Sequence, residues 1–108
     1  MKKIIDWLLS HGWTNTDACL FTRERDERAG MMIVNGQQIE QKHHSKYGIE
    51  LYGDGWISGD SGCEVLHFAH FTKRVNGMLM DGVSSGVRDL DEFLEEAVLV
   101  GSITPDEL

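Results

Sequence analysis

The chain has 108 residues, a formal net charge of −8, 41% hydrophobic residues and 26% charged residues. This length predicts a single domain, 1–108, because independent domains commonly contain about 100–150 residues. The excess of acids argues against direct binding to nucleic acid or to anionic membrane surfaces, since both depend on clustered Lys and Arg.

The N-terminal segment predicts a helix over 3–11. One apolar face recurs there at helical spacing: Ile4, Ile5, Leu8 and Leu9. Gly12 is suited to end this helix, because glycine adopts a positive φ at no steric cost, and Trp13 would then fold back on Leu8.

The same segment does not predict export. Asp6 interrupts its apolar run, and no small-residue cleavage site follows. No stretch of the chain approaches the roughly 18 apolar residues of a membrane span. We therefore expect a cytoplasmic protein that does not contact a membrane.

Short strand-like runs follow, separated by turn residues. These strand-like runs lie at 18–25, 31–34, 37–41, 49–52, 56–58, 63–73 and 78–80. Tight turns are predicted at Asn35-Gly36, Asp54-Gly55 and Asn76-Gly77, because both central residues of a type I′ turn need a positive φ. The polar segments 26–30 and 42–46 are predicted as loops.

A second helix is predicted over 90–100. Its apolar positions fall at i, i+3, i+4, i+7 and i+8: Leu90, Phe93, Leu94, Ala97 and Val98. Asp89 and Glu92 have the spacing of an N-cap and its N3 partner, and Gly101 can end the helix. We expect the tail 102–108 to be frayed, or alternatively docked by Ile103 and Leu108.

This order predicts an α+β fold. Five or six short strands would form one antiparallel sheet, with the N-terminal and C-terminal helices packed on one face. Both faces of the run 63–73 are largely apolar, which favours a central strand. The predicted core is Ile5, Leu8, Leu9, Leu66, Phe68, Phe93, Leu94 and Val98.

The histidines are candidate ligands or catalytic groups. They are His43, His44, His67 and His70. His67 and His70 would point to opposite faces of a strand, so the spacing does not require a metal site, and no metal or other cofactor is predicted. Cys63 and His67 share a strand face but are separated by roughly 13 Å of rise, so a catalytic pair is not predicted.

The basic residues of the first half are a further candidate site. Arg23 and Arg25 share a strand face, Arg28 follows, and Lys42 and Lys46 flank the histidines. Acids interleave with the arginines: Glu24, Asp26 and Glu27. An ion-paired sheet edge is therefore favoured over a site for anions or RNA.

One family likeness concerns residues 3–13. This helix with its Gly-Trp ending resembles the start of HicA-type toxins, small mRNA-cleaving proteins with a double-stranded-RNA-binding-like α-β-β-β-α fold. The resemblance implies a similar order of elements. The catalytic His of that family follows a Gly-Ser step on an early strand, whereas His43-His44 follow Gln41-Lys42, so no site residue carries over.

Charge is unevenly distributed along the chain. Residues 1–54 sum to −1 and residues 55–108 to −7, and no Lys or Arg follows Arg88. The acids of the second helix and its cap are the predicted partner-binding residues: Asp89, Asp91, Glu92, Glu95 and Glu96. A solvated helix surface is the simpler alternative interpretation.

The leading functional hypothesis is a non-catalytic, acidic interaction protein. It would bind a basic protein partner, such as a nucleic-acid enzyme, and block or regulate it, in the style of small accessory and inhibitor proteins of mobile elements. Two alternatives stay open: a small nuclease or metal-dependent hydrolase that uses the histidines, and a structural or oligomerising domain without a ligand.

Overall fold

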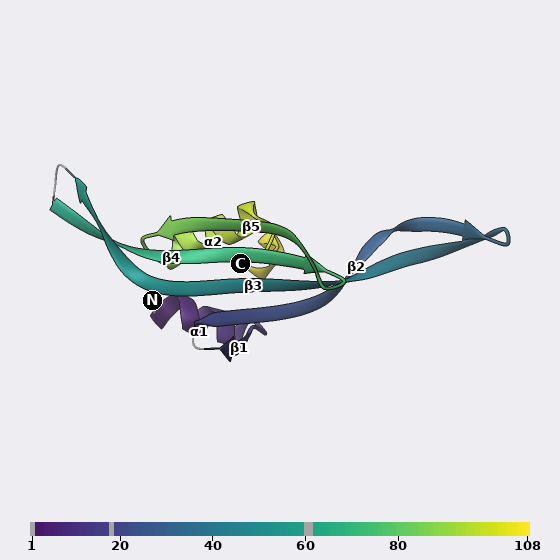
Figure 1. Cartoon of the computed structure of the whole chain (residues 1–108), viewed down its shortest axis with the longest axis horizontal. Helices are drawn as coiled ribbons and strands as arrows, with labels where there is room; N and C mark the ends of the chain where they lie inside the picture. The colour runs from purple at the N-terminus through teal and green to yellow at the C-terminus, as the bar shows by residue number, and fades with distance from the viewer. Residues whose placement is uncertain (1, 18, 60–61) are drawn as a thin grey trace.

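One antiparallel sheet runs through the whole molecule. A computed structural model describes residues 2–17, 19–59 and 62–108, with the side chains of 28–29, 54–59 and 62–66 outside this description. The elements are α1 (Lys2–Ser10), β1 (Thr14–Asp17), β2 (Leu20–Val34), β3 (Gln37–Gly59), β4 (Gly62–Val75), β5 (Met78–Val87), α2 (Leu90–Leu99) and the 3₁₀ turn η1 (Pro105–Glu107). The strands are ordered β1-β2-β3-β4-β5, each antiparallel to its neighbour (Figure 1). The predicted α+β class is confirmed.

Both helices contribute to one core on one face of the sheet. The buried apolar residues of that core are Ile4, Leu8, Trp13, Phe21, Tyr47, Ile49, Leu51, Ala69, Phe71, Val87, Phe93, Ala97 and Ile103. Phe93 of α2 stacks against Phe71 of β4, with ring centroids 5.7 Å apart. The opposite face of the sheet, which we call the open face, carries the alternate residues of the same strands.

Helix α1 ends as its sequence predicts, at a glycine with a positive φ. Gly12 has φ +84°, and the Trp13 backbone N–H donates to the Leu8 carbonyl at 3.1 Å. This is the six-to-one hydrogen bond of a Schellman ending. Trp13 is buried as a result, so the helix terminus and the core are fixed together.

The strands are much longer than predicted. Residues 26–30 and 42–46, predicted as loops, belong to β2 and β3, and Asp54-Gly55 continues β3 instead of turning. Gly30 and Gly53 have positive φ at register shifts of the ladder, so these glycines mark β-bulges.

The other two turn predictions are confirmed. Asn35 and Gly36 have φ of 52° and 78°, and Asn76 and Gly77 have φ of 50° and 85°. The first turn ends an extended hairpin, residues 26–43, which we call the arm (Figure 1). Among the described residues, its two strands pair only with each other.

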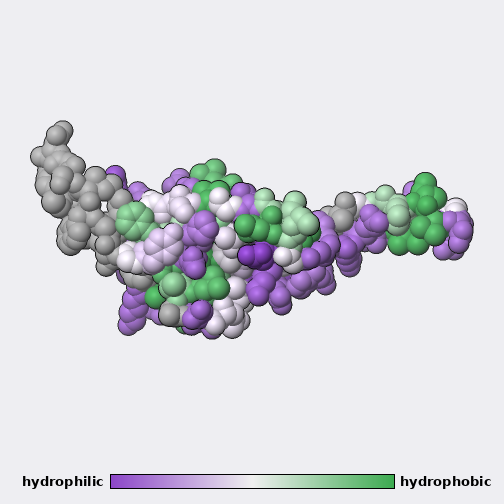
Figure 2. All heavy atoms as spheres, in the orientation of Figure 1, coloured by the Kyte–Doolittle hydropathy of each residue, from purple (hydrophilic) through white to green (hydrophobic). Residues whose placement is uncertain are grey.

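The arm ends in exposed apolar side chains. Figure 2 shows hydrophobic residues gathered at its far end, and the exposed apolar residues there are Met31, Met32, Ile33, Val34 and Ile39. Ile33 alone is 73% exposed. A two-stranded ribbon has no second layer to cover either of its faces, so these side chains stay in solvent.

The C-terminal segment is docked, not frayed. Gly101 has φ +81° and ends α2, and Ile103 is only 2% exposed. Thr104 and Glu107 form the capping box of η1. Leu108, the other predicted anchor, is 66% exposed, so Ile103 alone provides the apolar contact.

The predicted core is partly wrong about which side chains face inward. Leu8 and Phe93 are fully buried, and Ile5, Leu94 and Val98 pack partly buried against the core. Leu9 and Phe68 are instead 52% and 38% exposed, and Leu66 lies outside the described side chains. The helices cover the face of β4 that carries Ala69 and Phe71, whereas Phe68 shares the other face with His70 and Thr72.

Phe93→Ala tests the docking of α2. Removing a fully buried aromatic ring that contacts Phe71 should lower the free energy of unfolding by about 3–5 kcal/mol, measured by urea denaturation. Leu99→Ala on the same helix is the control, because Leu99 is 77% exposed and its loss should cost under about 0.5 kcal/mol. Equal losses for the two variants would contradict this packing.

Candidate functional site

The acids predicted to bind a partner begin at the start of α2, where two of them have structural partners. The Asp89 side chain accepts a hydrogen bond from the Glu92 backbone N–H at 2.9 Å, which confirms the N-cap. One Glu92 carboxylate oxygen accepts the Arg88 backbone N–H at 2.8 Å, and the other lies 3.8 Å from Arg88 Nε. These contacts stabilise the first turn of the helix.

A groove runs between α2 and the end of the edge strand β5. Its lining residues are Gly86, Val87, Glu92, Glu95, Glu96 and Leu99, and it encloses about 250 Å³. The Ser85 hydroxyl donates to Glu96 at 2.8 Å and so orients that carboxylate, while Glu95 is exposed. We call this the acidic groove. Of the predicted residues, Asp89 and the exposed Asp91 are not among those that line it.

The histidines do not come together. His43 lies 3.3 Å from Glu27, whereas His44 lies within 3.3 Å of Glu24 and Asp26. His70 is on the open face beside Ser84, at 2.7 Å, and His67 is on the helix side near Ile4, so the expected opposite orientation of this pair is confirmed.

The described residues therefore offer no assembled metal centre. Among them, no group of three or more His, Cys, Asp or Glu side chains could hold a metal ion. The Cys63 side chain lies outside the description, and β4 runs without a break from Gly62 to Val75, which keeps Cys63 and His67 separated along the strand. In the described ranges no helix is both long and apolar enough for a membrane crossing.

The arginines of β2 are ion-paired on the helix side of the sheet. Arg23 forms a bidentate pair with Glu107, at 2.8 and 3.1 Å, and lies over the Trp13 ring at 4.7 Å. Although partial burial raises the pKa of the Glu107 carboxyl, the hydrogen bonds and charge of Arg23 lower it overall. No pattern in the sequence indicates this contact, because 84 residues separate the partners. The Arg28 side chain is outside the description.

Glu27 is the central acceptor at the root of the arm. Its carboxylate lies 3.1 Å from Arg25 Nε, 3.2 Å from Lys73 Nζ and 3.3 Å from His43 Nε2. The Tyr47 hydroxyl also donates to it. Partial burial raises the pKa of this carboxyl, but the hydrogen bonds from Tyr47, Lys73 and Arg25 outweigh it and lower the pKa to about 2.

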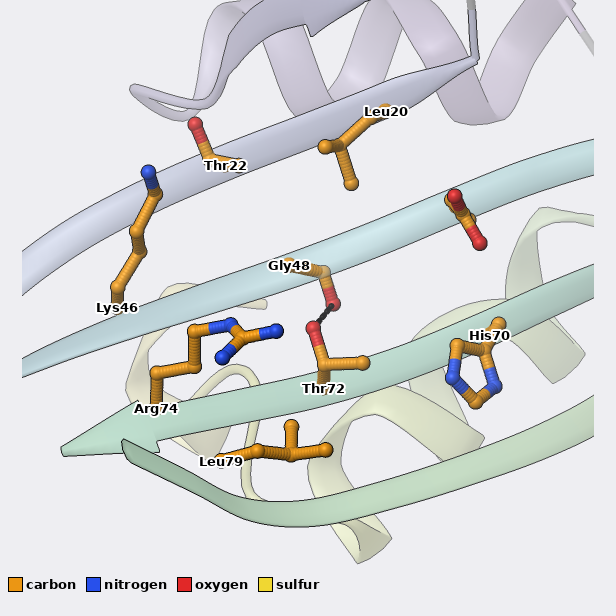
Figure 3. A pocket seen from close by; sticks show the side chains of 9 residues that line it. Leu20, Thr22, Lys46, Gly48, His70, Thr72, Arg74 and Leu79 are labelled. Atoms are coloured by element: carbon orange, nitrogen blue, oxygen red, sulfur yellow. Dashed lines mark hydrogen bonds between the residues drawn. The ribbon is translucent and has the colours of Figure 1, made fainter. Parts of the chain in front are cut away.

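A hollow separate from the acidic groove lies on the open face, and we call it the open-face hollow. It encloses about 370 Å³ and is lined by Leu20, Thr22, Lys46, Gly48, Glu50, His70, Thr72, Arg74 and Leu79 (Figure 3). Four strands contribute these residues, so no local sequence pattern indicates the site. Because residues 42–46 were predicted as a loop, nothing in the sequence indicated that Lys46 lies on a strand face.

Comparison with known proteins gives no assignment. No protein-family model, no curated protein and no solved structure matches the chain. The partial resemblance of residues 3–13 to HicA-type toxins therefore stays a likeness of one helix and its ending.

Glu27→Gln tests the role of this carboxylate. At neutral pH the variant should lose about 1–3 kcal/mol of stability, because it replaces a charged acceptor of several donors with an amide. The folded pKa, about 2, lies below the ordinary value of 4.5. The wild-type advantage should therefore be complete above pH 4.5 and be lost as pH falls toward 2.

Urea denaturation of both proteins across this pH range measures the difference. Glu24→Gln is the control on the same strand, because the Glu24 side chain is 57% exposed and is near His44. A stability difference between wild type and Glu27→Gln that stays constant with pH would contradict the assignment.

Proposed function

We propose that this chain is a non-catalytic, acidic interaction protein. It binds a basic segment of a partner protein and thereby blocks or regulates that partner. The observation that carries the proposal is the acidic groove, where Glu92, Glu95 and Glu96 lie beside the end of an edge strand. An enzyme that uses the histidines is less well supported, because the described histidines lie apart.

The edge position of β5 supports an extended partner. In the part of the chain that the structure describes, β5 has a neighbour only on its β4 side, so alternate backbone N–H and C=O groups along its outer edge point away from the sheet. A partner strand could add there through main-chain hydrogen bonds, while its Lys or Arg side chains reach the carboxylates of α2. Leu99, which is 77% exposed, adds an apolar contact at the rim.

The charge of the chain supports rapid and salt-sensitive association. Residues 55–108 sum to −7, and this half contains the acidic groove. Complementary charge steers diffusional encounter, and salt screens it over about 8 Å at physiological ionic strength. A nucleic-acid enzyme is a suitable class of partner because such enzymes carry basic surfaces.

The arm supports a second candidate function, self-association. Its exposed apolar tip is the kind of surface that a second copy could cover. Sedimentation of the full chain over a range of concentrations separates the two functions, since groove binding needs no dimer.

Neutralising the groove tests the proposed function. The double variant Glu95→Gln, Glu96→Gln should bind an extended Lys- and Arg-rich peptide about tenfold or more weakly, mostly through a slower on-rate. The amide that replaces the Glu96 carboxylate retains an acceptor for the Ser85 hydroxyl, so the fold is preserved. Association and dissociation rates, measured with the peptide immobilised on a sensor surface at low and high salt, quantify the effect.

A matched control keeps the same net charge. The variant Asp6→Asn, Asp106→Asn removes two exposed carboxylates on α1 and η1, outside the groove. It should bind the peptide almost as tightly as wild type. Equal weakening in both double variants would show that only net charge matters, and unchanged binding without salt dependence would remove the acidic groove as the site.

A further inference from the structure

A glycine, Gly48, forms the floor of the open-face hollow. A Cβ added at Gly48 would lie 2.5 Å from Thr72 Oγ1, far inside contact distance. The Thr72 hydroxyl donates to the Gly48 carbonyl at 3.5 Å. Figure 3 marks this contact with a dashed line. Side chains from the surrounding positions rise around this bare stretch of β3, so the hollow follows from the missing side chain. Its volume of about 370 Å³ falls within the usual range of small-molecule sites, about 300–1,000 Å³.

Two cations lie opposite each other at one end of this hollow. Lys46 of β3 and Arg74 of β4 are direct partners in the ladder and lie on the same face (Figure 3). Like charges in this position weaken strand pairing. Neither side chain has an ion pair or hydrogen bond within the described part of the chain. Glu24, opposite Lys46 on β2, has its carboxylate 3.3 Å from His44 Nε2.

The rest of the hollow is lined by hydroxyl groups, apolar side chains and a Glu–His pair instead of cations. Thr22 and Thr72 supply hydroxyl groups near the cations, and Leu20 and Leu79 supply apolar walls. Glu50 and His70, direct ladder partners, form the far end, where His70 Nδ1 is 2.7 Å from the Ser84 hydroxyl. A ligand that fits this distribution has an oxyanion at one end and an apolar body beside it.

We propose that the open-face hollow binds a small organic oxyanion, a phosphate or carboxylate carried on an apolar group. The oxyanion lies between Lys46 and Arg74 and relieves the repulsion between them, with the Arg74 guanidinium as a forked donor. The apolar group lies over Gly48 against Leu20 and Leu79. This site is separate from the acidic groove, which lies on the helix side of the sheet.

The ligand is a small molecule and not a nucleic acid. The net charge of −8 repels a polyanion along its whole length, whereas a single oxyanion meets the two cations at close range. Glu24 beside Lys46 and Glu50 at the far end of the hollow further oppose a continuous phosphate backbone.

Nuclear magnetic resonance titration of the full chain tests the proposal, with phenyl phosphate as the probe and inorganic phosphate for comparison. Phenyl phosphate should shift the backbone amide signals of Gly48 and Thr72 in a saturable manner and bind more tightly than inorganic phosphate. Lys46→Gln and Arg74→Gln should each weaken its binding about tenfold or more, because each removes one charge-assisted contact. Lys42→Gln on the exposed arm is the control for net charge and should leave the affinity almost unchanged.

Thermal unfolding provides the check on folding. Without ligand, Lys46→Gln and Arg74→Gln should unfold at or above the wild-type temperature, since each removes a like-charge pair. Saturating phenyl phosphate should raise the melting temperature of wild type more than that of either variant.

Four results would overturn the proposal. They are the absence of saturable binding, equal weakening by Lys42→Gln, equal affinity for inorganic and phenyl phosphate, and tighter binding of a single-stranded oligonucleotide than of phenyl phosphate. None of these depends on the acidic groove, so its failure and the failure of this site are distinguishable.

Discussion

The length difference between helices and strands determines the shape of this protein. A helix rises about 1.5 Å per residue and a strand about 3.3 Å, so the 9 and 10 residues of α1 and α2 span only about 15 Å each. The 15 residues of β2 span about 50 Å at this rise, and the 23 residues of β3 run along most of the molecule's 66 Å long axis. Two short helices can therefore cover only part of one face. The open face and the arm are the uncovered remainder, and the open-face hollow is part of it.

The charged cluster at the arm's root lies where the apolar core ends. Tyr47 is the buried apolar residue of β3 that lies nearest to the arm, and its hydroxyl donates to Glu27 on β2. Lys73 from β4 joins the same carboxylate, and Arg25 lies over the Tyr47 ring at 4.6 Å. Three strands are thus joined by polar contacts at the boundary of the core. Beyond this boundary only the hairpin's own ladder holds the arm, which explains why its tip stays exposed.

Local signals in the sequence predicted the helices and the turns at residues 35–36 and 76–77 correctly, because capping and a positive φ depend on neighbouring residues. They failed over 26–30 and 42–46 for a physical reason. Residues 26–30 and 42–43 belong to the two-stranded arm, which has no second layer and so needs no apolar alternation, whereas Ser45 and Lys46 also pair with β4 but are polar. Gly30 added to the error, since a glycine that permits a bulge is indistinguishable in sequence from one that permits a turn.

The two proposed binding surfaces differ in the same way, because one depends on residues close in sequence and the other on the register of the sheet. The carboxylates of α2 are close in sequence, so their grouping could be predicted, although Asp89 proved to be a cap and Ser85 came from the preceding strand. The open-face hollow depends on the register of four strands, and a shift of one residue would move Lys46 to the helix side. An acidic chain can therefore present a cationic site, because net charge is a sum over the surface while recognition depends on which side chains the ladder places opposite each other.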